Sequence, residues 1–352
     1  MKILVIQQKM IGDVLTSSIL FEALREKYPN AKLDYLINTH TYPVVENNPF
    51  VDNFVFLTKT EENSKIALYK FAKHIKNLNY DVVVDVYSKI SSNLITHLSG
   101  AKTKISYHKW YSAFIYHFNI KRLTTTNLDC GLAIVNRMQL LEPLKISFKE
   151  IKPKIYLTNQ ELENSKSFLL NNGIDFNKPL FMISVLGSGH NKTYPFDYMA
   201  QVIDQIAETT NGQILFNYIP NQETDAKAIY EKCKLTTQKL IYFDVFGKSL
   251  REFLALTAHC DAVIGNEGGA INMAKALHVK TFTIFSPWID KDTWNLFEEK
   301  GFHESVHLKD FEPKTYINKS EKALKPQAEK LYTKFKPAFF KEQLNVFLKQ
   351  IN

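Results

Sequence analysis

The sequence predicts an α/β protein of two tandem domains, each built on a mostly parallel sheet. Its 352 residues exceed what one ordinary core requires and suit two domains of about 150 to 180 residues each. Short apolar runs typical of buried parallel strands alternate with segments of helical period. The alternation stops near residue 151 and restarts near residue 180, so the two halves are expected to form separate α/β units.

The first half opens with the β-branched run KILVI at residues 2–6, which predicts a buried strand. A loop at 7–12 leads into a helix with apolar residues at 14, 15, 19, 20 and 24, ending before Pro29. By the same criteria we expect strands at 33–37, 54–57, 81–86 and 104–107, and helices at 66–78 and 91–98.

The second half repeats this alternation after a polar helix at 159–172. Strands are expected at 180–186, 213–218, 240–243, 262–264 and 281–285, and helices at 195–209, 223–233, 249–259 and 270–277. Pro195 is expected in the first turn of its helix, where proline is tolerated. We place the N-terminal domain at residues 1–155 and the C-terminal domain at 156–330. A final helix at 331–352 could pack back on the first domain.

The bulk composition favours anionic partners and a reducing compartment. The formal net charge is +8, and a basic excess attracts phosphorylated ligands, nucleic acid or an anionic membrane surface. The three cysteines are far apart and odd in number, which does not suggest a disulfide framework, so we expect a cytoplasmic protein. No stretch approaches the roughly 18 apolar residues needed to cross a bilayer. No recognisable nucleic-acid-binding module is present.

The last fifty residues are rich in lysine and phenylalanine. Residues 301–352 hold ten lysines and six acidic residues, with apolar side chains at roughly helical spacing from Phe335 to Leu348. A packing helix explains this pattern best, and a contact with a membrane surface is the alternative.

The first motif that could carry chemistry is Gly12-Asp13, between the first strand and its helix. Ligands of parallel α/β sheets sit beyond the carboxyl ends of the strands. Gly12 would allow a tight turn, which places Asp13 at the helix start. Taken alone, Asp13 is better explained as a carboxylate that stabilises the first helical turn.

Two further loops follow strands of the second half. The loop 186–195, LGSGHNKTYP, offers backbone N–H groups and the cation Lys192 to a phosphate. The loop 264–270, IGNEGGA, brings two glycines and Glu267 to a helix start. Each could be a plain connecting loop, but three such loops at matching strand ends are harder to explain that way. Asp290-Lys291-Asp292 matches a metal-binding DxD tripeptide, which is too frequent a pattern to predict a metal site.

These loops resemble glycosyltransferase family 9, the lipopolysaccharide heptosyltransferases. The stretch KILVIQQKMIGDVLTSSILFEALREKYPNAKLDYL is similar to the opening of that family, and YDVVVDVYSKISSNLITHL to its internal strand and helix. Lys192-Thr193-Tyr194-Pro195 resembles the family's K-x-W-P, and IGNEGGAINMAKAL resembles its N-D-[ST]-G-x-x-H-x-A-A-A-L. Phe285-Ser286-Pro287 stands for its [FY]-G-P.

The resemblance implies a GT-B fold, with two Rossmann-like domains facing across a cleft. It implies an inverting transfer, without metal or cofactor, from a nucleotide-sugar donor such as ADP-heptose to an anionic glycolipid acceptor. The N-terminal domain would bind the acceptor and the C-terminal domain the donor. Carried over position by position, the family pattern makes Asp13 the catalytic base and Lys192 the phosphate-binding lysine. The other donor-binding positions are Gly187, Ser188, Glu223, Glu267, Gly268 and Gly269, with Gly12, Asn266 and Asn272 supporting the loops.

Three positions depart from the family pattern. Glu267, Gly268 and Asn272 stand where the family has Asp, Ser or Thr, and His. A longer carboxylate and a lost hydroxyl would reshape the donor-sugar pocket, so the sugar is less firmly predicted than the transfer itself. Two alternatives stay open: a nucleotide-sugar epimerase of the same fold and a non-catalytic nucleotide-sugar-binding protein. The basic surface further predicts peripheral contact with the inner face of the cytoplasmic membrane.

Overall fold

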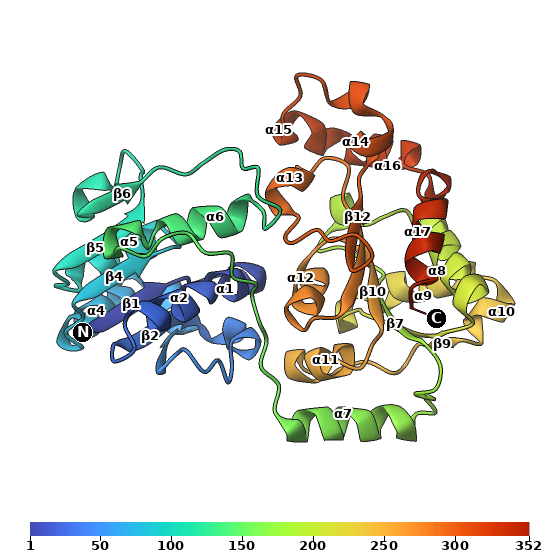
Figure 1. Cartoon of the computed structure of the whole chain (residues 1–352), viewed down its shortest axis with the longest axis horizontal. Helices are drawn as coiled ribbons and strands as arrows, with labels where there is room; N and C mark the ends of the chain where they lie inside the picture. Colours follow the sequence, from blue (N-terminus) through green and yellow to red (C-terminus); the bar gives the residue numbers. More distant parts are fainter. Residues whose placement is uncertain (352) are drawn as a thin grey trace. The chain divides into compact units, whose positions relative to one another are not determined.

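The computed structural model describes residues 1–351. The chain forms two compact units, a first unit at Met1–Tyr156 and a second unit at Leu157–Asn352 (Figure 1). Each unit is built on one six-stranded sheet, and every pairing between the named strands is parallel.

The sheet of the first unit has the strand order β3-β2-β1-β4-β5-β6. Its strands are β1 (Lys2–Ile6), β2 (Lys32–Asn38), β3 (Asn53–Leu57), β4 (Val82–Asp85), β5 (Thr103–Tyr107) and β6 (Phe118–Ile120). This is the order of a Rossmann fold, in which the direction of strand addition reverses between the first and fourth strands. The side chains of β1 are buried on both faces, which explains its unbroken apolar sequence.

Helices of the first unit follow its strands. They are α1 (Ile11–Ser17), α2 (Ile19–Lys27), α3 (Lys59–Asn63), α4 (Lys65–Asn77), α5 (Ile90–Leu98) and α6 (Leu132–Gln139). Alternate residues of a strand point to opposite faces, and Leu4 and Ile6 of β1 share a buried cluster with Ile75 of α4 and Ile95 of α5. Helices α4 and α5 therefore cover one face of this sheet.

The single long helix predicted after β1 is divided at Ser18 into α1 and α2. Two hydroxyls next to the break bond to the backbone: Thr16 Oγ1 donates to the carbonyl of Gly12 at 2.7 Å and Ser18 Oγ to that of Leu15 at 2.7 Å. Such bonds compete with the helical ladder and bend helices. The short edge strand β6 and helix α6 were not predicted.

The second unit repeats the strand order of the first. Its sheet runs β12-β11-β10-β7-β8-β9, made of β7 (Leu180–Ser184), β8 (Gln213–Phe216), β9 (Ile241–Tyr242), β10 (Ala262–Asn266), β11 (Lys280–Ile284) and β12 (His303–Val306). Counted within the unit, this is again the Rossmann order. Strand β12 has the sequence HESV, whose polar letters hid it from the sequence prediction although all four residues are buried.

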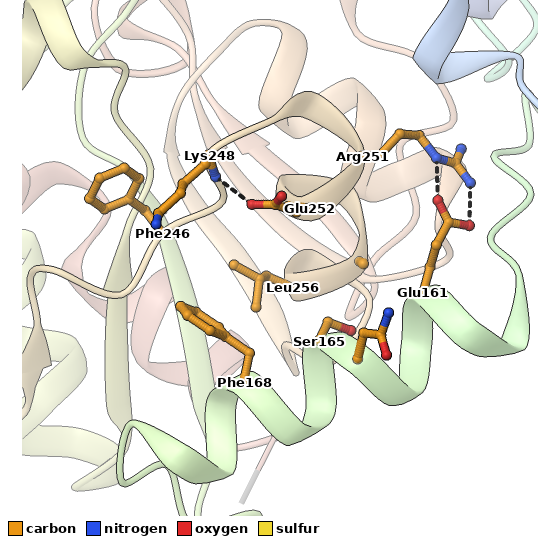
Figure 2. A pocket seen from close by; sticks show the side chains of 10 residues that line it. Glu161, Ser165, Phe168, Phe246, Lys248, Arg251, Glu252 and Leu256 are labelled. Carbon is orange, nitrogen blue, oxygen red and sulfur yellow. Dashed lines mark hydrogen bonds and ion pairs between the residues drawn. The ribbon is translucent and has the colours of Figure 1, made fainter.

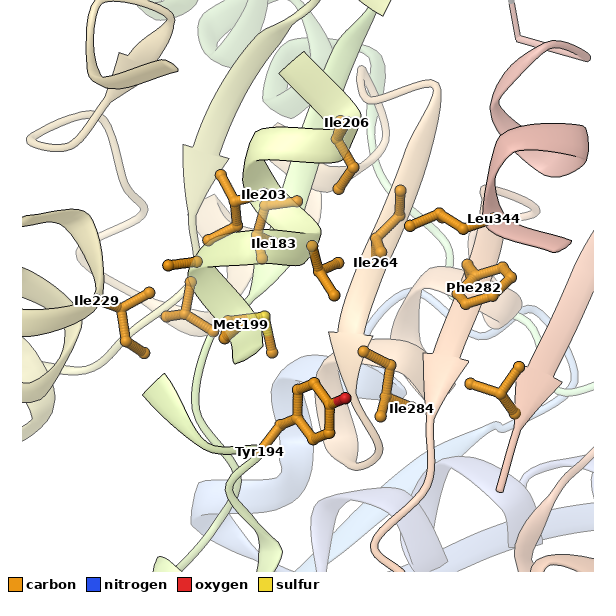
Figure 3. Close-up of a cluster of buried hydrophobic side chains, with 14 of the residues drawn as sticks. Ile183, Tyr194, Met199, Ile203, Ile206, Ile229, Ile264, Phe282, Ile284 and Leu344 are labelled. Atoms are coloured by element: carbon orange, nitrogen blue, oxygen red, sulfur yellow. The ribbon is translucent and has the colours of Figure 1, made fainter. Parts of the chain in front are cut away.

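Helices cover both faces of the second sheet (Figure 1). The longer ones are α7 (Asn159–Asn171), α8 (Phe196–Thr210), α9 (Glu223–Lys232), α11 (Leu250–Thr257), α12 (Gly269–Ala276), α16 (Ala328–Lys334) and α17 (Lys341–Leu348). Four-residue helices are α10 (Leu235–Gln238), α13 (Lys291–Trp294), α14 (Leu308–Phe311) and α15 (Glu321–Leu324). Figure 3 shows Ile183 of β7 and Ile264 of β10 packed with Met199 and Ile203 of α8 in the main core. Pro195 stands at the N-cap of α8, one position before the predicted first turn.

The C-terminal residues belong to this second core. Phe335, Phe340, Leu344 and Phe347 are fully buried there, and Gln205 of α8 donates to the side-chain oxygen of Asn345 at 2.7 Å. This corrects the expectation that the last helix returns to the first domain, because its apolar face is filled by the second unit. It also favours the packing helix over a membrane contact, since these aromatic side chains are not available at the surface.

Candidate functional site

The predicted site loops follow the strands at which strand order reverses. In the first unit these strands are β1 and β4, and in the second unit they are β7 and β10, which pair directly in each case. Ligands of open parallel sheets bind in the crevice at this point. The loop with Asp13 follows β1, the loop with Lys192 follows β7, and the loop with Glu267 follows β10. The topology therefore brings Lys192 and Glu267 together at one end of one sheet.

Asp13 lies in the first turn of α1, as predicted, and its carboxylate is held from one side. The guanidinium of Arg137 donates to Asp13 Oδ1 at 2.7 Å. The Asp13 side chain keeps 35% of its surface exposed, whereas Arg137 keeps 10%. One oxygen is thus fixed by an ion pair while the carboxylate stays accessible, which is what a group that takes a proton from a ligand requires.

Arg137, on α6, was missed by the sequence reasoning. It also donates to Ser17 Oγ at 2.9 Å and to the carbonyl of Ala133 at 3.0 Å, so its planar head is fixed by three acceptors. The one available signal was an arginine within the apolar helix LAIVNRMQ, in a chain that has four arginines against forty lysines. Arginine suits this place because its rigid fork of donors matches several acceptors at once.

The turn before α1 is made at Met10 and not at Gly12. Met10 is the N-cap and has a φ of 63°, while Gly12 is the second residue of the helix. A positive φ is uncommon for a residue with a side chain and marks backbone strain near a site. The prediction that Gly12 makes the turn is therefore wrong, because the helix already begins at Ile11.

Asp85 ends β4, next to β1, and is completely buried. Its carboxylate accepts from the hydroxyl of Tyr116 at 2.6 Å and from the backbone N–H of Ser88 at 2.8 Å. Burial raises the pKa of this carboxyl to about 6, although both hydrogen bonds act in the opposite direction. Asp85 fastens the loop after β4 to the segment that enters β6, which makes it a structural residue of this sheet edge.

In the second unit, Lys192 and Glu267 form an ion pair, with Lys192 Nζ 3.2 Å from Glu267 Oε1. The Glu267 side chain is nearly buried, at 11% exposed, and this burial raises the pKa of its carboxyl against the opposing effect of Lys192. Lys192 Nζ also lies 5.7 Å from the centroid of the Trp288 ring. The predicted phosphate-binding cation is therefore neutralised in the free protein and remains partly exposed.

Two glycines shape these loops. A Cβ at Gly187 would lie 2.1 Å from the backbone oxygen of Lys192, so the loop closes on itself only with glycine at this position. Gly268 is the N-cap of α12 with a φ of 148°, and nothing lies within 4 Å of where its Cβ would be. The start of α12 is thus open to the close approach of a ligand, as expected for an anion site at a helix start.

Asn266 joins the two loops of the second unit. Its side chain accepts from the backbone N–H of Tyr194 at 2.7 Å and donates to the carbonyls of Ser184 and Val185, both at 2.9 Å. Asn266 thus ties the loop after β7 to the end of β10. Among the other predicted residues, Ser188 and Gly269 are exposed and Asn272 is half-buried on α12.

Glu223, predicted to contact the donor ribose, is the exposed first residue of α9. Its neighbour Gln222 points back instead, donating to the carbonyl of Gly187 at 3.1 Å. The role of Glu223 remains a prediction, and Gln222 is a loop residue that the sequence reasoning overlooked.

The tripeptide Asp290-Lys291-Asp292 is tied into local contacts. Asp290 accepts from the hydroxyl of Thr293 at 2.5 Å, and Lys291 Nζ lies 3.3 Å from Glu298 Oε1 and 3.6 Å from Asp310 Oδ2. Within residues 1–351, no three His, Cys, Asp or Glu side chains are grouped so as to hold a metal ion.

The second unit also contains cavities. One of about 290 Å³ lies between α7 and α11, and Figure 2 shows its apolar floor of Phe168 and Leu256 and the paired Glu161 and Arg251 at its rim. None of the predicted site residues lines it. Another, of about 510 Å³, is lined by Trp288 and by some of the residues between Ile289 and Leu324. It adjoins the candidate site, because Trp288 also faces Lys192.

None of the helices in the described part of the chain combines the length and the apolar character required to span a bilayer.

Solved structures confirm the fold class. A glycosyl transferase of family 9 from Veillonella parvula superposes with a TM-score of 0.74 at 17% identity, over 95% of this chain and 97% of that chain. The ADP-heptose lps heptosyltransferase II of Escherichia coli gives 0.68 at 15% identity, over 95% and 99%. Two Rossmann-ordered sheets with site loops at their switch points thus define a two-domain α/β protein of the GT-B type.

The sequence comparison gives the family. Residues 68–321 match the profile of glycosyltransferase family 9 (heptosyltransferase). Lipopolysaccharide heptosyltransferase 1 of Campylobacter coli is 22% identical over 297 residues, which is 81% of this chain and 84% of that protein. Because the profile matches well over half of the chain, the protein belongs to glycosyltransferase family 9 and is a glycosyltransferase. This decides against the epimerase and the non-catalytic alternatives.

Proposed function

We propose that this protein transfers heptose or a related sugar, with inversion at the anomeric carbon and without a metal, from an ADP-linked donor to a glycolipid of the lipopolysaccharide-core type. Family membership supports the reaction class. The names of the relatives, which are lipopolysaccharide heptosyltransferases, support the sugar and the acceptor. The observation that carries the proposal is the carboxylate of Asp13, fixed by Arg137 through one oxygen and accessible to a ligand.

Asp13 acts as the general base. As the acceptor hydroxyl attacks the anomeric carbon, its proton passes to the Asp13 carboxylate, and the bond from that carbon to the diphosphate oxygen breaks. The bonding electrons leave with the diphosphate, and the configuration inverts because attack and departure occur on opposite sides. Arg137 is a positioning residue, since it orients Asp13 through the 2.7 Å hydrogen bond and would not touch the substrate.

The second unit stabilises the leaving group. The departing diphosphate gains negative charge, which Lys192 and the backbone N–H groups of the loops at Ser188, Gly268 and Gly269 offset. Gly187 shapes its loop, because its own N–H donates to Thr193 Oγ1 at 3.1 Å. Lys192 is paired with Glu267 in the free protein, so donor binding requires the diphosphate to share or displace that partner. Glu267, Glu223 and Asn272 are left to contact the sugar or the ribose.

The acceptor is an anionic, lipid-linked saccharide, which agrees with the net charge of +8. The enzyme would then work at the inner face of the cytoplasmic membrane as a peripheral protein.

The test combines ligand binding with turnover. Thermal unfolding is measured with ADP-, UDP-, GDP- and CMP-linked sugars, because a ligand of the native state stabilises it by about 2.7 kcal/mol at 100 times its Kd. We expect ADP-heptose to give the largest shift. Asp13→Asn should lower turnover by about 10²- to 10⁴-fold without weakening donor binding, and Asp129→Asn serves as the control at an exposed carboxylate. Full turnover of Asp13→Asn would remove Asp13 from the role, and stabilisation by another nucleotide alone would refute the ADP donor.

A further inference from the structure

A long segment of the first unit carries no acidic side chain. Between Asp85 and Asp129 the chain has five lysines, one arginine and three histidines, with neither aspartate nor glutamate. The whole protein has 44 basic and 36 acidic residues, so this stretch alone concentrates most of the net charge of +8. Such a charge block on a folded surface is an electrostatic footprint for an anionic partner.

The fold gathers four of these cations at one edge of the sheet. Lys89 follows β4, Lys109 follows β5, and Lys121 and Arg122 follow β6, all at carboxyl ends of neighbouring parallel strands. The three loops are bonded together: Lys109 Nζ donates to the carbonyl of Ser88. The backbone N–H of His108 donates to the carbonyl of Ile120 at 2.8 Å. The cations therefore belong to one surface and not to three independent loops.

These cations have no carboxylate partner. In the part of the chain that the structure describes, none of the four forms an ion pair with an acidic side chain. Partial burial lowers the pKa of Lys109, and the neighbouring charges of Lys89 and Arg122 lower it further. Buried Asp85 acts in the opposite direction and raises this pKa in part. Mutual repulsion of this kind would be relieved by bound anionic groups.

Large apolar side chains project from the same loops. Ile90 is 82% exposed, Trp110 87% and Phe114 81%. Trp110 packs edge-on against Tyr111, whose ring lies 6.0 Å from Lys109 Nζ. Exposed apolar groups gathered in one place mark an interaction site. Aromatic side chains interleaved with lysine and arginine suit the boundary between lipid headgroups and acyl chains.

We propose that the loops after β4, β5 and β6 form a docking surface for an anionic phospholipid bilayer, in which Ile90, Trp110 and Phe114 enter the headgroup boundary and Lys89, Lys109, Lys121 and Arg122 contact lipid phosphates. The combination of cations that lack a carboxylate partner with projecting apolar side chains selects a bilayer, because a soluble phosphate would use the cations and leave the apolar groups in water.

The surface deepens the proposed function and rests on it for its purpose. Asp13 follows β1, which pairs with β4, so the base belongs to the same carboxyl edge of the sheet as the docking loops. A bilayer held at this edge would present a lipid-linked acceptor hydroxyl to Asp13. Binding to vesicles does not depend on glycosyl transfer, so the two proposals fail separately.

The experiment measures co-sedimentation of the full chain with vesicles of phosphatidylcholine, alone and mixed with phosphatidylglycerol, without donor. The wild type should bind the mixed vesicles more tightly and release them as salt rises. Lys89→Gln/Lys121→Gln should weaken that binding about 25-fold, since each charge near the surface contributes about fivefold. Trp110→Ser should weaken it about tenfold through lost apolar burial.

Matched controls lie on exposed positions of the second unit. Lys166→Gln/Lys239→Gln removes the same charge, and Leu235→Ser removes an apolar side chain that is 77% exposed; both should bind as the wild type. Equal binding to both vesicle types, or an equal loss in the control and test pairs, would overturn the proposal. The proposal would also be overturned if the wild type formed a dimer that does not bind vesicles and that Trp110→Ser dissociates. That result would assign the surface to a second copy of the chain. Asp13→Asn should bind vesicles normally, and intact vesicle binding without any sugar transfer would refute only the proposed function.

Discussion

Replacing Arg137 by methionine tests whether the Asp13 carboxylate owes its alignment to the guanidinium. Methionine keeps much of the apolar stem of Arg137, which is buried in α6, and removes the head that donates to Asp13 at 2.7 Å, to Ser17 at 2.9 Å and to Ala133 at 3.0 Å. Asp13 is 35% exposed and can regain water. We therefore expect a modest loss of stability, about 1 to 2 kcal/mol, well below the cost of stranding a fully buried charge.

The loss of turnover should be larger than the loss of stability suggests. A misplaced catalytic group costs about 10²-fold, and the whole contribution of a general base is about 10²- to 10⁴-fold. We expect Arg137→Met to lower kcat by about 10²-fold while the donor KM stays unchanged. Arg137→Lys should fall between wild type and Arg137→Met, because an ammonium group keeps the charge without the planar fork.

A double-mutant cycle separates alignment from general damage. If Arg137 acts only through Asp13, then Arg137→Met in an Asp13→Asn background should cost less than about threefold more, because coupled residues are non-additive. Initial rates at saturating donor measure this, with thermal unfolding as the check on folding. Two losses that multiply in the double variant, or an Arg137→Met enzyme with full kcat, would refute the reasoning.

Two further predictions concern charges at the strand ends. Lys192→Ala should weaken binding of the nucleoside diphosphate, measured by calorimetry, about 10- to 100-fold, which is the range of a charge-assisted hydrogen bond. Lys239→Ala, at an exposed lysine, should leave the affinity unchanged. Equal affinities of the Lys192→Ala variant and the wild type would exclude a phosphate role for Lys192. Asp85→Asn should gain stability relative to wild type as pH rises. The folded-state pKa of Asp85 is raised from 3.8 to about 6, so ionisation penalises the folded wild type above that range and not below 3.8. The gain should reach about 2 kcal/mol between pH 4 and pH 7 in denaturant titrations, and a difference independent of pH would contradict the assigned burial.

Much of the fold could be predicted because its strands are buried on both faces. Runs such as KILVI need no partner to be recognised, since parallel strands covered by helices are apolar throughout. The misses have local causes. Strand β6 has three residues at a sheet edge, β12 contains His303 and Glu304, and the break at Ser18 depends on hydroxyls that bond to the backbone in the fold. Strand order followed only from the resemblance to a family with Rossmann-like domains, because an apolar run does not indicate which strands lie beside it.

The site was predictable only where a loop carried it. Asp13, Lys192 and Glu267 were found because each follows a strand and precedes a helix. Arg137 lies 124 residues from Asp13 in a helix without a motif, so only the fold reveals their contact. Trp288 was not singled out in the sequence, and its position near Lys192 depends on β11 lying beside β10.

Each unit places a cation beside a carboxylate, with one member of the pair in the segment that follows its first strand. The proposed reaction uses the two pairs in opposite ways. In the first unit the cation is Arg137, always charged and fixed by three acceptors, and the exposed member is the carboxylate. In the second unit the carboxylate, Glu267, is nearly buried, and the exposed member is the flexible ammonium of Lys192. A catalytic base must be accessible to the acceptor. A lysine that binds phosphate must be able to leave its carboxylate partner when the donor binds. The relative burial within each pair is therefore compatible with the proposed mechanism, in which the first unit takes the proton and the second stabilises the leaving group.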